Sequence, residues 1–228
     1  MQIYSFNYNG TTFFEKQVES FKKSIQHPFE FYSVDNSSDS STPHDLKRLC
    51  SKLNVNYLEV KNKNHSLGGL SHQTAMNYVL RNHVKRDSPS FFVDFDTYMM
   101  KPVNLYNELE DNDFVGIQQS RNHIRYFHPG FLLFDSRKVN PQEMDLFGGH
   151  VDGIMVDSGG QLSKYISKYN SKLKGFSLNY FDDFGFELIG GFLMHFRAGS
   201  NWDRNPRYHE RLNKFNDYYK QYTEENHA

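Results

Sequence analysis

Phe91-Phe92-Val93-Asp94-Phe95-Asp96-Thr97-Tyr98 is a run of large apolar residues interrupted by two aspartates that stand two positions apart. The run predicts a buried strand over residues 90–94. Because strand side chains alternate between two faces, Asp94 and Asp96 are expected to point the same way. Mg²⁺ and Mn²⁺ bind carboxylates and phosphate oxygens, so the pair indicates a metal-diphosphate site. The alternative is that one aspartate caps the next turn and the other is merely solvated.

The segments around this run predict an α/β fold. Similar apolar runs predict strands over residues 2–7, 29–34, 56–60, 114–118 and 130–134. Apolar residues at helical spacing lie between the early strands, around residues 18–25, 46–53 and 75–80. Alternation of this kind builds a mainly parallel sheet with helices on both faces, and ligands bind beyond the carboxyl ends of its strands.

The pattern changes after Asp96, where strands follow each other with little helix between them and a mixed sheet is expected. A helix is predicted around residues 162–169, followed by strands over 175–179 and 186–195. The tail from residue 208 to 222 is predicted to be a charged and aromatic helix that packs on the domain or on a second subunit.

The composition excludes several classes of protein. The chain has 228 residues, with 26 basic and 27 acidic side chains and a formal net charge of -1. A nucleic-acid binder or a polybasic membrane-surface protein would need a basic excess, so neither is expected. The length suits one or two domains, and without repeats we expect one. Its 21 Phe and 15 Tyr supply a large core and suit stacking on sugars or bases.

The cysteine content and the apolar segments predict a cytoplasmic protein. The single cysteine, Cys50, excludes an internal disulfide and a cysteine zinc site, and the reducing cytosol is then the default compartment. The first residues lack the features of a secretory signal, and no apolar segment approaches the roughly 18 residues of a membrane span.

Two further motifs lie at the same predicted edge of the sheet. The second strand ends in Val34-Asp35-Asn36-Ser37-Ser38-Asp39, where Asp35 can accept hydrogen bonds from a base or ribose, or can form an ordinary Asx-turn. Gly68 and Gly69 open the third predicted helix, and N–H groups at a helix N-terminus attract phosphate. Each motif is weak alone, so their order along the chain carries the argument.

Taken in order, the three features resemble the GT-A fold glycosyltransferases, in which such motifs bind a metal and a nucleotide-diphosphosugar. The loop after residue 35 is similar to the Asp-Asp-Gly-Ser-x-Asp nucleotide loop of family 2 enzymes, and Ala75-Met76-Asn77 to the Ala-Arg-Asn of their third helix. Asn36, Met76 and Ser71 depart from that pattern, where the family has an acidic residue, an arginine and a glycine. The match spans about the first hundred residues and suggests a divergent viral or bacterial branch.

The resemblance implies a single domain over residues 1–228, with a nucleotide-sugar half at 1–100, an acceptor half at 101–207 and a C-terminal helix at 208–228. It implies Mn²⁺ or Mg²⁺ held by Asp94, Asp96 and His195, and a nucleotide-sugar donor of the UDP-sugar type. The other donor-binding residues that it implies are Asn7, Asp35, Gly68, Gly69, Arg197, Ser200 and Asn201. Of these, Arg197, Ser200 and Asn201 would hold the leaving diphosphate. For His195 the alternative is a core histidine hydrogen-bonded to backbone.

The resemblance also implies residues on the side of a glycan or other hydroxyl acceptor. His128 and Gly130 would face the sugar, or else form a plain turn into a buried strand. Asp157 would be the catalytic carboxylate or bind a donor hydroxyl, although an aspartate before a helix also serves as an N-cap. Asp182 and Asp183 are further candidates for that role.

Two other functions fit parts of the pattern. A nucleotidyltransferase shares the sheet and the metal carboxylates, but it would show a basic glycine-rich loop near the first strand. Here that loop is Asn7-Tyr8-Asn9-Gly10-Thr11-Thr12, without Lys or Arg. A metal-dependent carbohydrate-binding module also accounts for the aromatic and acidic residues, and it would bind a glycan without a nucleotide.

Overall fold

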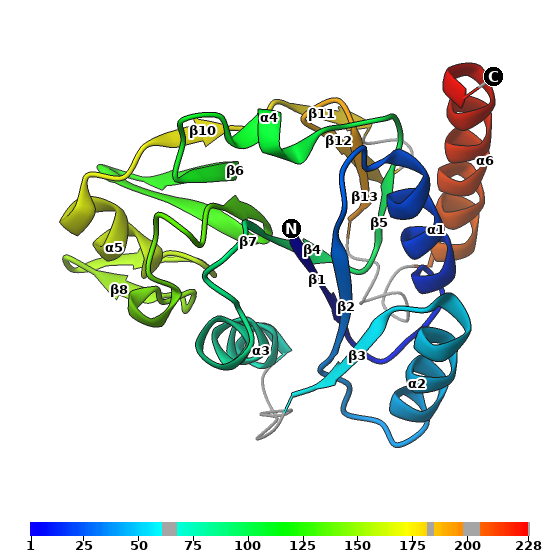
Figure 1. Ribbon diagram of the computed structural model, residues 1–228, viewed down its shortest axis with the longest axis horizontal. Helices are drawn as coiled ribbons and strands as arrows, with labels where there is room; N and C mark the ends of the chain where they lie inside the picture. The colour runs from blue at the N-terminus through cyan, green and yellow to red at the C-terminus, as the bar shows by residue number, and fades with distance from the viewer. Residues whose placement is uncertain (61–67, 182–184, 198–205, 228) are drawn as a thin grey trace.

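The large sheet carries the predicted parallel strands and an antiparallel addition. The computed structural model describes residues 1–60, 68–181, 185–197 and 206–227 (Figure 1). The sheet order is β10-β6-β7-β4-β1-β2-β3. Its strands are β1 Gln2–Asn7, β2 Glu30–Asp35, β3 Asn56–Glu59, β4 Ser90–Asp94, β6 Phe114–Arg121, β7 Ile124–Phe134 and β10 Leu173–Gly175. Strands β1 to β4 pair in parallel, whereas β7 pairs antiparallel with β4 and β6.

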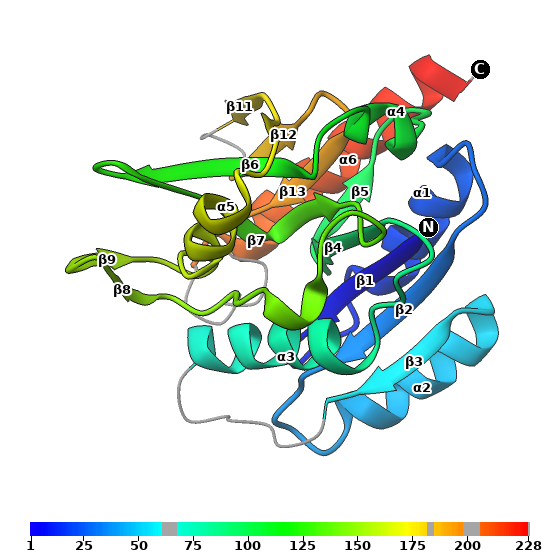
Figure 2. The same cartoon turned by 60° about the vertical axis from the view of Figure 1, so that its left-hand side comes forward.

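Helices cover both faces of this sheet because successive strand residues point to opposite sides. Phe91 and Val93 pack with helices α1 (Phe14–Ser24) and α2 (Thr42–Leu53), whereas Phe92 packs on the other face. That second face carries α3 (Gly68–Asn82) and α5 (Leu162–Tyr169). Figure 1 and Figure 2 show α3 and α2 on opposite sides of β2 and β3. The predicted mixed, mainly parallel sheet between helices is confirmed.

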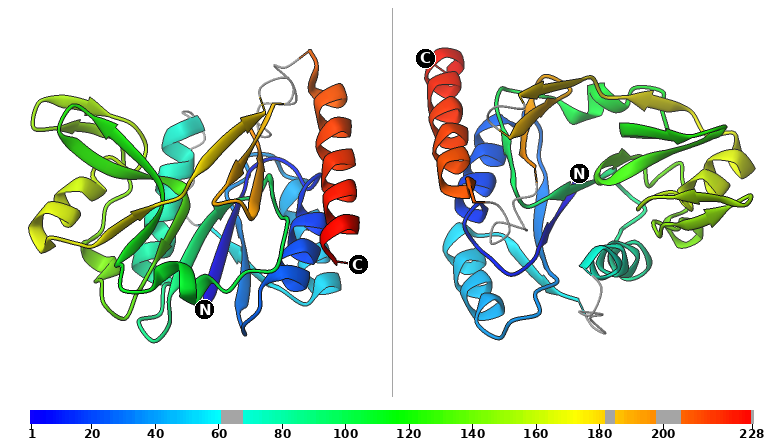
Figure 3. Two further views of the ribbon diagram at one scale, coloured as in Figure 1. Left: turned by 90° about the horizontal axis from the view of Figure 1, so that it is seen from above. Right: turned by 180° about the vertical axis from the view of Figure 1, so that it is seen from behind.

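A second sheet follows the bend after β4. Its order is β11-β12-β13-β5, with all neighbours antiparallel. Its strands are β5 Thr97–Met99, β11 Leu178–Phe181, β12 Phe186–Ile189 and β13 Leu193–Phe196. Phe186, Met194 and Phe196 face the long helix α6 (Tyr208–His227), with Phe215 packed among them. The C-terminal helix therefore packs back on this sheet, as Figure 3 shows from two sides.

Several predicted strands are wrong in extent. Those expected over residues 114–118 and 130–134 are longer, because β6 ends at Arg121 and β7 begins at Ile124. The strand expected over residues 186–195 is a hairpin, because Gly190 and Gly191 take φ values of 61° and 72° and reverse the chain. The strand expected over 175–179 is split between β10 and β11. Several short elements were not expected, since they are too short to show a period. They are β5, α4 (Leu105–Leu109), the 3₁₀ turn η1 (Pro141–Glu143), β8 (Gly149–Val151) and β9 (Ile154–Val156).

Within the described ranges, none of the helices is both long enough and apolar enough to cross a membrane.

Candidate metal and donor site

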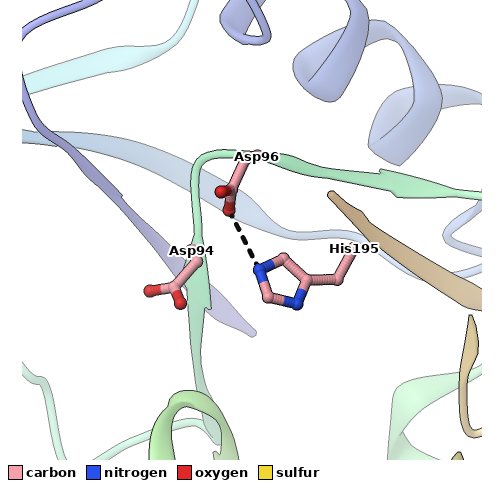
Figure 4. Close-up of side chains that lie close together, drawn as sticks. All are labelled: Asp94, Asp96 and His195. Atoms are coloured by element: carbon pink, nitrogen blue, oxygen red, sulfur yellow. Dashed lines mark ion pairs between the residues drawn. The ribbon is translucent and has the colours of Figure 1, made fainter. Parts of the chain in front are cut away.

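Two aspartates and a histidine meet where the chain passes from the large sheet to the small one. Their ligand atoms all lie within 4.8 Å of one another. Figure 4 shows Asp96 and His195 facing each other, with Asp94 beside them at the end of its strand. Asp94 ends β4, whereas Asp96 lies in the bend beyond the strand, and His195 is on β13. The bend is fixed by helix α1 and by the small sheet. The Gln17 amide of α1 donates to the Asp94 carbonyl at 2.8 Å, and the Phe196 N–H of β13 donates to the Asp96 carbonyl at 2.9 Å.

Glu187 orients the histidine. It stands opposite His195 in the β12–β13 register, and its Oε1 lies 2.8 Å from His195 Nδ1. Nδ1–H therefore donates to Glu187, which turns Nε2 toward the Asp96 carboxylate at 3.4 Å. The ring nitrogens face two carboxylates, so the alternative of a histidine bonded to backbone is wrong.

Two more histidines surround Asp94. His72 of α3 places Nε2 3.1 Å from Asp94 Oδ1, and His128 of β7 lies close enough to act on its charge. Burial opposes ionisation of Asp94, but the charge and hydrogen bond of His72, with smaller effects of His128 and His195, lower its pKa to about 2. Burial would lower the pKa of His195, but Asp96 and Glu187 raise it to about 10. The surrounding histidines therefore favour the ionised form of Asp94, and the neighbouring carboxylates favour the charged form of His195.

The donor set fits a divalent cation that accepts both oxygen and nitrogen ligands. Carboxylates suit Mg²⁺ and Mn²⁺, and an imidazole held by a second carboxylate is a common arrangement at metal sites. Gly130 makes room for this arrangement, because a Cβ at that position would lie 2.3 Å from Asp94 Oδ2. Of the two ions predicted, Mn²⁺ suits the mixed oxygen and nitrogen set better.

The residues predicted at the nucleotide end are buried and internally bonded. Asp35 is fully buried, with Oδ1 accepting from the Ser37 N–H at 2.8 Å and Oδ2 accepting from the Tyr57 hydroxyl at 2.6 Å. This is the Asx-turn named as its alternative. Asn7 pairs with Asp35 in the β1–β2 register, and its amide donates to the Ser33 hydroxyl at 3.1 Å. Their part in donor binding stays a prediction.

Asp157 lies at the base of the β8–β9 hairpin and is exposed. The N-cap of α5 is Gln161, so the N-cap alternative for Asp157 is wrong, and its Oδ1 accepts instead from the Ser158 N–H at 3.0 Å. The turn sits against β7, where a Cβ on Gly159 would lie 2.1 Å from the Phe127 carbonyl oxygen. We call Asp94, Asp96 and His195 the aspartate-histidine group. Within the described parts of the chain, Asp157 makes no ion pair or hydrogen bond with this group.

Some of the remaining predicted site residues lie within the described residues, and others do not. Helix α3 begins at Gly68, so Gly68 and Gly69 form its first turn. Nδ1 of His128 accepts from the Gly130 N–H at 3.2 Å, and the Arg197 guanidinium lies 5.5 Å from the centre of the Tyr180 ring. Four candidates fall outside the described residues: Ser200, Asn201, Asp182 and Asp183.

Two residues of the site were missed from the sequence. His72 was seen only as the end of the glycine loop, although the helical spacing places it one turn after Gly68 and Gly69. Glu187 would have been found had the glycine pair at 190 and 191 been interpreted as a hairpin turn, because the register then sets residue 187 opposite residue 195.

Comparisons with known proteins show the fold class. No family model matches the sequence, and no curated protein matches it. The structure of residues 1–349 of S. aureus TarS in complex with UDP-GlcNAc aligns over 76% of this chain and 55% of its own, with a TM-score of 0.50 and 13% identity. A mannosyltransferase, PcManGT from Pyrobaculum calidifontis, in complex with GDP-Man and Mn²⁺, aligns over 76% of this chain and 53% of its own, with a TM-score of 0.49 and 17% identity.

The chain spans about half the length of these two structures. A mixed, mainly parallel sheet with helices on both faces, together with the likeness to TarS, defines the GT-A fold that the resemblance predicted. An Asp-x-Asp pair with a histidine lies at the carboxyl end of its central strand β4.

Proposed function

We propose that the protein transfers a sugar from a nucleoside diphosphate sugar, with a UDP-sugar as donor, to a hydroxyl group of a glycan or other acceptor. The observation that carries the proposal is the convergence of Asp94, Asp96 and His195 within 4.8 Å at the edge where GT-A folds bind ligands. The UDP-GlcNAc complex of TarS, which has this fold, supports the donor class.

The chain's own residues are arranged to receive a cation and a diphosphate. When bound, Mn²⁺ would neutralise the charge that develops on the leaving diphosphate. Glu187 fixes the tautomer of His195, and His72 holds the Asp94 carboxylate, so two of the three metal ligands are held by neighbouring side chains. We assign the first turn of α3 and Arg197, with Ser200 and Asn201, to the diphosphate, and Asn7 and Asp35 to the nucleoside.

We assign Asp157 to the reacting hydroxyls. It is exposed, and its turn lies against the strand that carries His128 and Gly130. In an inverting reaction Asp157 would take the proton from the acceptor hydroxyl at about 3 Å. In a retaining reaction it would bind a hydroxyl of the donor sugar.

The proposal is tested with a panel of nucleotide sugars incubated with the protein and Mn²⁺. We expect release of a nucleoside diphosphate that stops when EDTA removes the metal. Release of pyrophosphate from a nucleoside triphosphate would instead favour a nucleotidyltransferase. Glycan binding without release from any donor would favour a carbohydrate-binding module.

A further inference from the structure

A cleft lies at the far end of β7, between the β6–β7 turn, the β8–β9 hairpin and α5. This β7-tip cleft is a cavity of about 770 Å³, within the usual range for small-molecule pockets. Its lining includes the buried apolar side chains Ile124, Val151 and Ile166. Three serines and Asn170 also line the cleft.

The rim of the β7-tip cleft is basic, although the chain as a whole carries a net charge of -1. Arg125, Lys164 and Lys168 line it, against the single carboxylate of Asp152. Lys168 is paired with Glu143 at 2.8 Å. Arg125 and Lys164 are exposed, and among the described residues they form no ion pair, so both charges are available to a ligand. Such a surface attracts phosphate, sulfate or carboxylate groups.

Two elements extend from the cleft to the proposed active site. Strand β7 runs from Ile124 in the cleft to Gly130 beside Asp94, a span of about 20 Å at 3.3 Å per residue. The β8–β9 hairpin has Asp152 at its turn and Asp157 at its base, so it joins the cleft to the candidate catalytic carboxylate. A ligand in contact with both ends must be a chain, not a single sugar.

We propose that the β7-tip cleft binds an anionic segment of the acceptor, which is a saccharide chain bearing phosphate, sulfate or carboxylate groups. Arg125 and Lys164 bind the anionic groups, and the apolar floor supports the faces of the sugar rings. The chain then extends along β7 so that its terminal hydroxyl reaches the aspartate-histidine group. This inference rests on the proposed function, whose donor chemistry does not depend on the cleft.

Binding is measured with fluorescently labelled dextran sulfate as the anionic saccharide and neutral dextran of the same length. We expect the protein to bind dextran sulfate and not neutral dextran, and the double variant Arg125→Glu/Lys164→Glu to bind at least about tenfold more weakly. The matched control is Lys23→Glu/Lys47→Glu. These residues lie on α1 and α2, at the opposite end of the molecule from α5 in Figure 1, and their replacement changes the net charge equally.

Equal weakening by the control variant, equal binding of neutral dextran, or tighter binding of anionic lipid vesicles than of dextran sulfate would each overturn the inference. The same variants are assayed for Mn²⁺-dependent nucleoside diphosphate release with water as acceptor. If Arg125→Glu/Lys164→Glu loses dextran sulfate binding but releases nucleoside diphosphate at the wild-type rate, the cleft and the donor site are distinct. Absent release in every form, with binding intact, would count against the proposed function and leave the cleft as an anionic-saccharide site.

Discussion

The two sheets of the protein contribute to one site by different rules. In the parallel region, from β1 to β4, a helix joins each strand to the next, and the ligand-facing residue is the one at the strand's carboxyl end. In the antiparallel region, His195 is placed by pairing with its neighbours β12 and β5. Asp96 lies in the bend between the two regions. The site residues of the parallel region can therefore be predicted from the local sequence. Those of the antiparallel region depend on the pairing register of the strands.

Asp96→Asn is expected to have the largest effect, because Asp96 lies in the bend between the two sheets. The substitution removes the negative charge of the side chain and keeps its shape. We expect metal-dependent nucleoside diphosphate release to fall by about 10³-fold, since stabilisation of the leaving group is the main catalytic effect of such sites. The measurement is the initial rate at saturating Mn²⁺, with thermal unfolding to show that the fold persists.

The matched control for this variant is Asp45→Asn on α2, where the carboxylate is half exposed and lies 3.4 Å from Arg48. It should retain the wild-type rate. Wild-type release by Asp96→Asn would refute the metal assignment.

Glu187→Gln tests the contribution of register in the antiparallel region. The amide oxygen keeps a weaker acceptor for His195 Nδ1, so we expect the Mn²⁺ concentration at half-maximal rate to rise by about 10- to 100-fold. Excess Mn²⁺ should restore most of the rate, because Glu187 positions a ligand and does not bind the cation. Glu224→Gln, on the exposed face of α6, is the control. A loss of rate that excess metal does not restore would contradict the positioning role.

Most of the fold was predictable where local pattern decides it. The helical spacing of Val18, Phe21 and the residues that follow gave α1, and the apolar run before Asp94 gave β4 with its observed bounds. The long strand predicted over residues 186–195 was wrong, because apolar content does not reveal that Gly190 and Gly191 turn the chain. Elements of three residues, such as β5 and β8, carry too few positions to show alternation.

The candidate site was predictable to the same extent. The two aspartates and His195 were chosen from motif and order, and the structure brings them together. Glu187 was not found, because its place opposite His195 is a property of the hairpin and not of its neighbours in sequence. His72 was not singled out, since contact with Asp94 depends on how α3 packs on the sheet. Long-range packing therefore supplied the residues that position the ligands.

Gly130→Ala on β7 and Gly116→Ala on β6 distinguish an effect on metal binding from an effect on the stability of the fold. A Cβ on Gly130 would lie 2.3 Å from Asp94 Oδ2, the movable end of a side chain, whereas one on Gly116 would lie 2.3 Å from the backbone oxygen of Phe131. We expect Gly130→Ala to weaken Mn²⁺ binding by about tenfold with little loss of stability. Gly116→Ala should lower the free energy of unfolding by about 1–3 kcal/mol.

Urea unfolding and Mn²⁺ titration of both variants give the two measurements. The distinction would fail if Gly130→Ala were as unstable as Gly116→Ala, because the carboxylate would then be as rigidly held as the backbone.

Asp135→Asn tests the stability of the large sheet at the end of β7, away from the metal site. The Asp135 side chain is only 2% exposed, and its two oxygens accept from Arg137 Nε and Nη2, each at 2.8 Å. Burial would raise the pKa of Asp135, but the hydrogen bonds from the Arg137 side chain and backbone lower it below the usual range. Because Arg137 is half exposed, water screens the pair, and we expect a loss of about 1–2 kcal/mol in the free energy of unfolding at neutral pH.

The pH dependence of this loss gives the sharper result. A carboxyl whose pKa is lower in the folded state than in the unfolded state stabilises the protein fully above its unfolded pKa of about 3.9. That contribution is lost as the pH falls through the folded pKa. The difference in unfolding free energy between the wild type and Asp135→Asn should therefore be constant from about pH 7 to pH 5 and should shrink below about pH 4. A difference that persisted in acid would mean that the shape of the turn, and not the charge of Asp135, stabilises the end of β7.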